Sequence, residues 1–318
     1  MHKKGWMILT LAMVMILAAC GTNGNNASDG KSGDQEEQAT RTVSHAMGET
    51  EVPENPEKVV ILTNEGTEAL LAMDVTPVGA VQSWLGDPWY DHISDQMEGV
   101  EVVGTESEVN LEAVAGLKPD LIIGNKLRQE DIYDQLSAIA PTVYSETLKG
   151  DWQENFTFYA KAMNMEDKGD EVMSAYNDRI DSMSEELGDQ LDKEVSVVRF
   201  LAGQTRIYYK DSFSGVILEQ LGFDRPESQQ KNDFAKEVTK ERIPEMDGDV
   251  LFYFTYDAGD GDANSTAKEW TNDPLWNNLE VVKEDNVHEV SDAIWNTSGG
   301  VISANKMLDD IENVFLSK

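Results

Sequence analysis

The sequence is poor in cysteine, histidine and basic charge. Its 318 residues include one Cys and four His, and 25 Lys and Arg stand against 60 Asp and Glu. A single cysteine excludes an intramolecular disulfide framework and a zinc cluster of several cysteines. Four scattered histidines leave little material for a receptor that would ligate bare Mn²⁺ or Zn²⁺. The formal charge of −35 argues against nucleic acid as a partner, because that affinity comes largely from Lys and Arg.

The common catalytic motifs are absent as well. The sequence contains no Gly-x-Ser-x-Gly elbow, no P-loop, no His-Glu-x-x-His and no dinucleotide glycine fingerprint. Two carboxylates can hydrolyse a glycosidic bond, but a pair identifies nothing in a chain with 60 acidic residues. We therefore expect no enzyme and no cofactor, and a secreted carboxylate-based hydrolase remains the weaker alternative.

The N-terminus has the pattern of an export signal. Two lysines precede an apolar run over residues 5–19, which is shorter than the ~20 residues that span a bilayer. The small residues before Cys20 resemble the lipobox of bacterial lipoproteins. That resemblance implies a signal peptide over residues 1–19 and a lipid, such as palmitate, on the thiol of Cys20. An uncleaved anchor helix is the alternative.

The segment behind this cysteine is polar. Residues 21–40 are Gly, Asn, Ser, Thr, Gln and charged residues, with Ala as the only apolar type. Such a stretch cannot bury enough surface to offset its ordering entropy, so we expect a flexible tether over residues 20–41. A folded domain would then be held at the extracytoplasmic face of the cell membrane.

Short apolar runs alternate with amphipathic stretches in the rest of the chain. Strands are predicted at residues 59–62, 78–81, 121–123, 195–198, 207–209 and 250–253. Helices are predicted at residues 67–73, with Thr67 as the cap, and at 111–117 and 214–221. Strands that alternate with helices are typical of α/β proteins with parallel sheets covered on both faces.

The chain reads as two similar halves joined by a helix. Apolar residues recur at spacings of three or four over residues 167–191, which predicts one long helix near the centre. Residues 110–123 align with 239–252, and each copy places a Glu two residues after a polar cap. We expect two pseudo-symmetric α/β lobes, with a ligand crevice between them at the strand ends. Their predicted limits are residues 42–150 and 194–318, with residues 151–193 as the linker.

Five segments together resemble a known family. They are residues 51–60, 65–71, 110–124 and 212–223, and the sequence Ile294-Trp-Asn-Thr297. In this order they are similar to the iron–siderophore substrate-binding lipoproteins of Gram-positive ABC importers, from about Val43 to Phe315. The resemblance implies two Rossmann-like lobes joined by a single long helix with little hinge motion. It also implies a monomer that binds a ferric siderophore and docks on a permease with a cytoplasmic ATPase. Asp74 departs from the pattern, since the family often has Gly there.

The resemblance also indicates what a binding cleft would need. Iron inside a siderophore is already surrounded by oxygen ligands, so the receptor need not ligate it. Chelates of the hydroxamate or citrate type are often anionic, which calls for basic and aromatic side chains at strand ends. We expect ligand contacts from Trp84, Lys126, Arg128, Arg199, Arg206, Tyr208 and Trp295. The alternatives are a solvated surface pair for Lys126 and Arg128, an internal salt bridge for Arg199, and core packing for the tryptophans.

Glu112 and Glu241 occupy equivalent places in the two halves. Each is predicted in the first turn of a helix, where the helix dipole favours a carboxylate, so capping alone would explain them. The resemblance implies that both dock onto arginines of the permease. A cobalamin or haem receptor of the same architecture remains the main alternative to a siderophore receptor.

Overall fold

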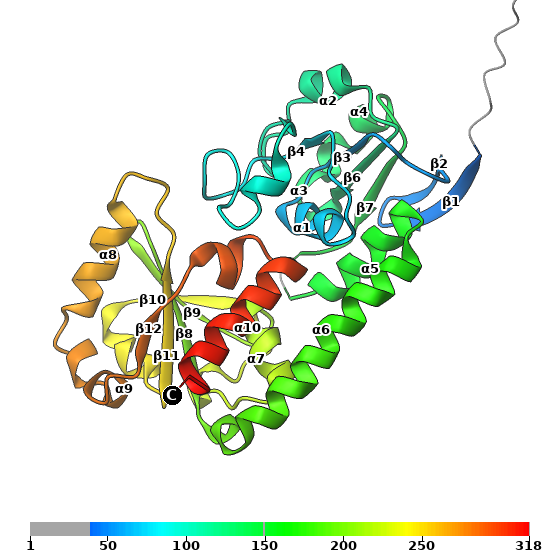
Figure 1. Cartoon of the computed structure of the whole chain (residues 1–318). Helices are drawn as coiled ribbons and strands as arrows, with labels where there is room; N and C mark the ends of the chain where they lie inside the picture. The colour runs from blue at the N-terminus through cyan, green and yellow to red at the C-terminus, as the bar shows by residue number, and fades with distance from the viewer. Residues whose placement is uncertain (1–38, 149, 318) are drawn as a thin grey trace, which may run out of the picture. The chain divides into compact units, whose positions relative to one another are not determined.

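Two five-stranded sheets organise the chain (Figure 1). The computed structural model describes residues 39–148 and 150–317. The expected signal peptide, Cys20 and most of the tether lie outside these residues. Within them, β1 (Thr40–His45) pairs antiparallel with β2 (Gly48–Pro53), so the last two residues assigned to the tether belong to a strand.

The sheet of the first lobe is entirely parallel, with the order β5-β4-β3-β6-β7. Its strands are β3 (Val59–Ile61), β4 (Gly79–Ala80), β5 (Glu101–Val102), β6 (Leu121–Asn125) and β7 (Thr142–Ser145). Its helices are α1 (Asn64–Ala72), α2 (Leu111–Leu117), α3 (Lys126–Gln129), α4 (Tyr133–Ser137) and α5 (Trp152–Met163). Every residue of β3, β6 and β7 is buried, and the burial of β3 and of the first three residues of β6 explains their continuous apolar runs in the sequence.

Helix α1 begins earlier than predicted. Its cap is Thr63, whose side chain accepts a hydrogen bond of 3.0 Å from the amide of Gly66. Thr67 lies inside the helix and donates its hydroxyl to the carbonyl of Thr63, so its assignment as the cap was wrong. After the helix, Asp74 adopts a left-handed conformation with φ of 64° and pairs with Lys168 at 3.2 Å. The departure from glycine at this position is therefore accommodated, at the modest cost that Asp has in this conformation.

The sheet of the second lobe is mixed, with the order β10-β9-β8-β11-β12. Its strands are β8 (Val195–Leu201), β9 (Gln204–Tyr208), β10 (Ala235–Val238), β11 (Val250–Thr255) and β12 (Val287–Glu289). Its helices are α7 (Phe213–Leu221), α8 (Asp262–Thr271), α9 (Glu280–Lys283) and α10 (Val301–Phe315). Strands β8, β11 and β12 are parallel, as expected, but β9 is antiparallel to both of its neighbours, β8 and β10. A two-residue hairpin with Gly203 at φ of 67° joins β8 to β9, and so short a turn permits only antiparallel pairing.

The aligned segments of the two halves differ in helix type. In the first lobe, α2 matches the predicted helix 111–117, and Asn110 caps it by accepting from the amide of Ala113. In the second lobe, residues Lys240–Met246 form a 3-10 helix that contains Pro244. Proline has no amide hydrogen to donate, which disfavours a regular α-helix there.

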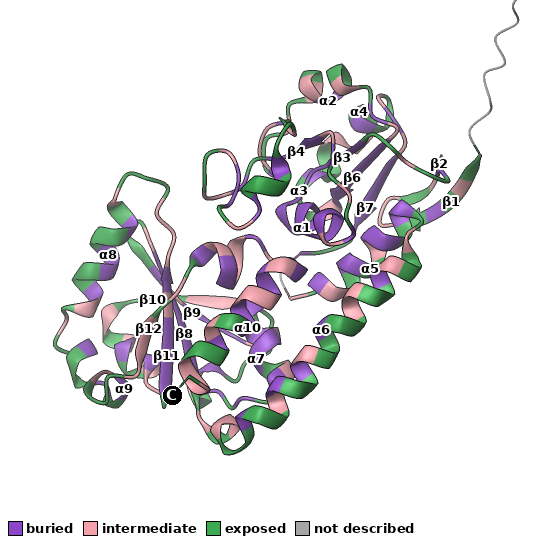
Figure 2. Ribbon diagram, viewed as in Figure 1, coloured by how far each residue is buried: buried purple, intermediate pink, exposed green. Residues whose placement is uncertain are grey.

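One long helix, α6 (Glu166–Leu187), connects the lobes. Its buried stripe includes Tyr176, Ile180 and Met183, and it packs on α5 of the first lobe and on α7 and α10 of the second. Gly188 ends it with φ of 48°, and a 3-10 turn replaces the last predicted residues. Figure 2 shows α6 with an exposed outer face, and both sheets with buried strands at their centres. Within the described residues, no helix is sufficiently long and apolar to cross a membrane.

Candidate functional site

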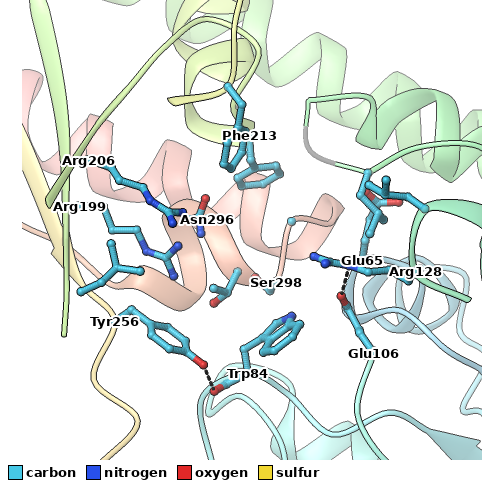
Figure 3. A pocket seen from close by; sticks show the side chains of 16 residues that line it. Glu65, Trp84, Glu106, Arg128, Arg199, Arg206, Phe213, Tyr256, Asn296 and Ser298 are labelled. Atoms are coloured by element: carbon cyan, nitrogen blue, oxygen red, sulfur yellow. Dashed lines mark hydrogen bonds and ion pairs between the residues drawn. The ribbon is translucent and has the colours of Figure 1, made fainter. Parts of the chain in front are cut away.

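A cavity of about 390 Å³ lies between residues of the two lobes (Figure 3). We call this cavity the cleft. Its lining from the first lobe is Glu65, Trp84, Glu106, Leu127, Arg128 and Leu148. Its lining from the second lobe is Arg199, Leu201, Arg206, Phe213, Phe234, Tyr256 and residues 296–299. Most of these residues follow the carboxyl ends of parallel strands, where open α/β sheets bind ligands.

Arg199 on β8 is the most constrained cation of the cleft. It is 7% exposed, and its Nε and Nη2 donate to the two carboxylate oxygens of Asp292 at 2.6 and 3.1 Å. Its Nη1 donates to the hydroxyl of Tyr208 at 3.1 Å, and its guanidinium lies 5.0 Å from the ring centre of Tyr256. Burial alone would lower the pKa of Arg199, but Asp292 and Tyr208 raise it overall. The internal salt bridge is thus present, and Arg199 lines the cleft at the same time.

Arg206 on β9 has no such compensation. Among the described residues, no carboxylate lies within 4.0 Å of it, and its Nη2 donates to Gln204 at 3.4 Å. Tyr208 lies two residues further along the strand, on the same face, as the sequence predicted. Tyr208 does not line the cleft: it is fully buried, and its hydroxyl holds Arg199 from behind.

The wall of the first lobe pairs an arginine with a buried carboxylate. Arg128 is half-exposed, its Nε lies 3.4 Å from Glu106, and its guanidinium lies 5.8 Å from the ring centre of Trp84. Glu106 also accepts from the amide and the side chain of Asn64 at 2.8 and 2.9 Å. Arg128 is therefore not part of a solvated surface pair. The hydroxyl of Tyr256 in the second lobe donates to the carbonyl of Trp84 at 3.3 Å and links the two walls.

Glu65 is a second buried carboxylate in this wall. It is 6% exposed, and the hydroxyl of Tyr159 donates to it at 3.0 Å. Burial raises the pKa of Glu65 well above its ordinary range, and the hydrogen bonds from Tyr159 and Asn155 offset this effect only in part. Burial also raises the pKa of Tyr159, so its hydroxyl keeps the proton that it donates.

Two further expected ligand contacts lie outside the cleft. Lys126 pairs with Glu146 at 3.0 Å on the surface, as the alternative interpretation held. Trp295 is fully buried, stacks on Phe252 at 4.4 Å between ring centres, and donates its indole N–H to Asp310 at 2.8 Å. Its expected place in a loop was wrong, because Ala293–Thr297 forms a π-helical turn that packs the tryptophan into the core. The residues that follow it, 296–299, line the cleft instead.

Sequence reasoning missed several residues of the cleft, chiefly Glu65, Glu106 and Tyr256. Glu65 belongs to one of the segments that carried the family resemblance, and Tyr256 directly follows the strand β11. Those two positions were the available signals. Glu106 had none, because only its burial distinguishes it from the other acidic residues.

Glu112 and Glu241 are both exposed to solvent, so neither carboxylate needs an ion pair to offset burial. Glu112 lies in the first turn of α2, and Glu241 in the first turn of the 3-10 helix that matches it. A hydrogen bond with the side chain of Thr239 lowers the pKa of Glu241, so it carries a full negative charge at neutral pH. Within the described part of the chain, no group of three or more His, Cys, Asp or Glu could hold a metal ion.

Comparisons with known proteins match nearly the whole chain. The profile of the periplasmic binding protein family matches residues 59–293. The chain is 54% identical to the probable siderophore-binding lipoprotein YfiY of Bacillus subtilis (strain 168), over 98% of this chain and 97% of that one. It is 31% identical to the Fe(3+)-citrate-binding protein YfmC of the same strain, over 96% and 94% of the two chains. Among solved structures, SirA of Staphylococcus aureus complexed with staphyloferrin B matches with a TM-score of 0.79 and 34% identity, over 86% and 98% of the two chains.

Proposed function

Because the chain belongs to the periplasmic binding protein family, we propose that it captures a ferric siderophore and delivers it to the permease of an ABC importer. The observation that carries the proposal is the cleft itself, in which three arginines and four aromatic rings from the two lobes line one cavity. Planar guanidinium groups suit carboxylate and hydroxamate oxygens, and aromatic rings suit the apolar linkers of such chelates. The names of the relatives YfiY and YfmC support the same ligand class.

The charges of the cleft favour a weakly anionic chelate of the hydroxamate or citrate type. Glu106 offsets Arg128, and Asp292 offsets Arg199, which leaves Arg206 as the uncompensated cation among the described residues. A neutral corrinoid gains little from such a cation, whereas a chelate with a small negative charge gains a charge-assisted hydrogen bond.

Tryptophan fluorescence tests the ligand class. We expect ferric citrate–hydroxamate chelates to quench the emission of the protein at micromolar or lower concentrations, because Trp84 lines the cleft. Trp84→Phe should lose most of the quenching while calorimetry still detects binding. If cobalamin or haem alone bound to the protein, the siderophore assignment would be wrong.

We also propose that Cys20 carries the lipid that anchors the chain outside the cell membrane. The basic and apolar residues before it support this, as does the word lipoprotein in the name of the relative YfiY. Mass spectrometry of the membrane fraction tests the proposal, since Cys20→Ala should abolish acylation. Lipid retained on that variant would contradict it.

Glu112 and Glu241 are proposed to dock on the permease. Their exposure and their equivalent places in the two lobes support this role. Reversing both charges with Glu112→Lys and Glu241→Lys should reduce siderophore uptake more than about tenfold, because opposite charges steer and fix such complexes. The dissociation constant of the chelate should not change.

The control for docking is Glu101→Lys, which reverses an exposed charge on β5 of the first lobe. We expect normal uptake from this variant. Loss of chelate affinity in the double variant, or equal loss of uptake in the control, would refute the docking role.

A further inference from the structure

Glu65 stands apart from the other acidic residues around the cleft because it forms no ion pair with any residue that the structure describes. Glu106 pairs with Arg128, and Asp292 pairs with Arg199. Among the described residues, no Lys, Arg or His lies within ion-pair distance of Glu65. Glu65 is 6% exposed as a residue, lies in the first turn of α1, and lines the cavity beside Arg128 (Figure 3).

The groups packed around Glu65 disfavour a negative charge there. Tyr159 and Asn155 of α5 hydrogen bond to the carboxyl group, which favours the charged form. Glu106 and Asp151 repel a second negative charge here, and Arg128, which lies beside Glu65 in the cavity, is already paired with Glu106. The N-terminus of α1 favours a carboxylate, but this gain is smaller than the cost of burying a charge that has no counter-ion. Burial is also the largest cause of the raised pKa of Glu65.

We propose that Glu65 keeps its proton in the cleft and donates its O–H to an oxygen atom of the bound chelate. This inference rests on the proposed function and makes Glu65 a specificity-determining residue of it. A neutral carboxylic acid adds a hydrogen-bond donor beside Arg128 without adding negative charge. The first lobe therefore favours chelates that place an acceptor oxygen atom next to Glu65. A chelate with an ammonium group there would need the ionised form and would be disfavoured.

The proposal fixes the sign of two pH dependences. The chelate-binding form of Glu65 is the protonated one, so affinity falls as the pH rises through its raised pKa, by about tenfold per unit above it. In the unfolded chain a glutamate titrates near pH ~4.3. Between that pH and the raised pKa of the folded state, the folded protein therefore keeps a proton on Glu65 that the unfolded chain has lost. The stability that this proton contributes is fully present below that pH and declines as the pH rises toward the folded pKa.

Glu65→Gln is the matched variant, because the amide donates at the same place, accepts from Tyr159 and does not titrate. Chelate dissociation constants of Glu65→Gln and wild type are compared by calorimetry from about pH 5 to pH 9, so that titration of the chelate cancels in the ratio. We expect Glu65→Gln to bind within about 3-fold of wild type at low pH and to bind more tightly than wild type at high pH. Glu65→Met, which cannot donate, should bind about 10-fold more weakly at low pH.

A second readout needs no ligand. The melting temperature of Glu65→Gln relative to wild type should rise with pH, whereas that of Glu101→Gln, an exposed control in the same lobe, should not. The proposal would be overturned if the difference in melting temperature between Glu65→Gln and wild type did not change with pH. It would also be overturned if Glu65→Gln bound the chelate more than about 10-fold more weakly than wild type at every pH. If no chelate bound to wild type, the proposed function and the ligand contact would both fall, while the melting profile would still decide whether Glu65 holds its proton. If Glu65→Met did not fold, the two pH profiles of Glu65→Gln would decide the outcome.

Discussion

We expect Arg206→Gln to lower the affinity for the ferric siderophore by about 10- to 100-fold, the largest effect of any single change in the cleft. Arg206 has no carboxylate within 4.0 Å among the described residues, so its charge is available to the ligand. Losing a charged hydrogen bond costs about 1.5–3 kcal/mol, and each 1.4 kcal/mol corresponds to about tenfold in affinity. The melting temperature should not change, because Arg206 is only partly buried and Gln204 is its one hydrogen-bond partner on β9. Calorimetry with the same chelate measures the effect.

Two other substitutions serve as comparisons for Arg206→Gln. Arg128→Gln should cost less affinity, because Glu106 already offsets the charge of Arg128. Lys126→Gln should cost none, since Lys126 pairs with Glu146 outside the cleft. Raising the salt concentration should weaken wild-type binding more than binding by Arg206→Gln. Equal affinities of Arg206→Gln and Lys126→Gln would show that the ligand does not use this cation.

The sequence predicted most of the elements whose burial is nearly complete, but it missed β7, which is buried although half of its residues are polar. Strands β3, β6, β8 and β11 are mainly apolar because both faces of their sheets are covered, and α6 shows the spacing of a one-sided helix. The exposed strand β5 and the partly buried strand β12 have no apolar run, so the apolar pattern did not predict them. A strand was predicted where β9 ends, but its antiparallel direction was missed for another reason. Strand direction depends on the length of the connecting turn, and the apolar pattern is the same for either direction.

The cations of the cleft were predictable and its acids were not. Basic residues are scarce in this chain, so their positions at or beside the ends of strands pointed to Arg128, Arg199 and Arg206. Glutamates are abundant, and Glu65 differs from the rest only in being buried without a counter-ion. Burial of that kind results from tertiary packing. The same holds for Trp295, whose π-helical turn decides that it faces the core.

The two lobes also meet behind the cleft, through a carboxylate of the first lobe and a helix of the second. Glu68 on α1 is fully buried, and its Oε2 accepts from the amide and the hydroxyl of Ser303 at 2.8 and 3.0 Å. Ser303 lies in the first turn of α10, so Glu68 satisfies an amide that the helix leaves free. The ring of His92 lies 2.5 Å from the other oxygen of Glu68. One side chain therefore contacts three hydrogen-bonding groups within the buried interior.

We expect Glu68→Ala to lower the free energy of unfolding by about 3–5 kcal/mol, because removing a buried charged partner leaves the remaining groups unsatisfied. The melting temperature should fall by roughly 10 °C. Glu68→Gln should lose less, since an amide oxygen can still accept from Ser303. Glu185→Ala, which removes an exposed carboxylate from α6, is the control and should melt within about 1 °C of wild type. Equal melting temperatures of Glu68→Ala and Glu185→Ala would contradict the role of this contact.

The same substitution should also weaken chelate binding, by a route separate from stability. Gly300 packs against Glu68, where an added Cβ would come within 2.6 Å of the Glu68 side chain. The residues just before it, 296–299, line the cleft. Without the contact between Glu68 and Ser303, residues 296–299 are no longer held against the first lobe. We therefore expect faster amide hydrogen exchange at Ser303, and a lower affinity for the chelate at temperatures where the variant is fully folded. An affinity equal to wild type, together with a lowered melting temperature, would mean that Glu68 stabilises the fold without positioning the wall of the cleft.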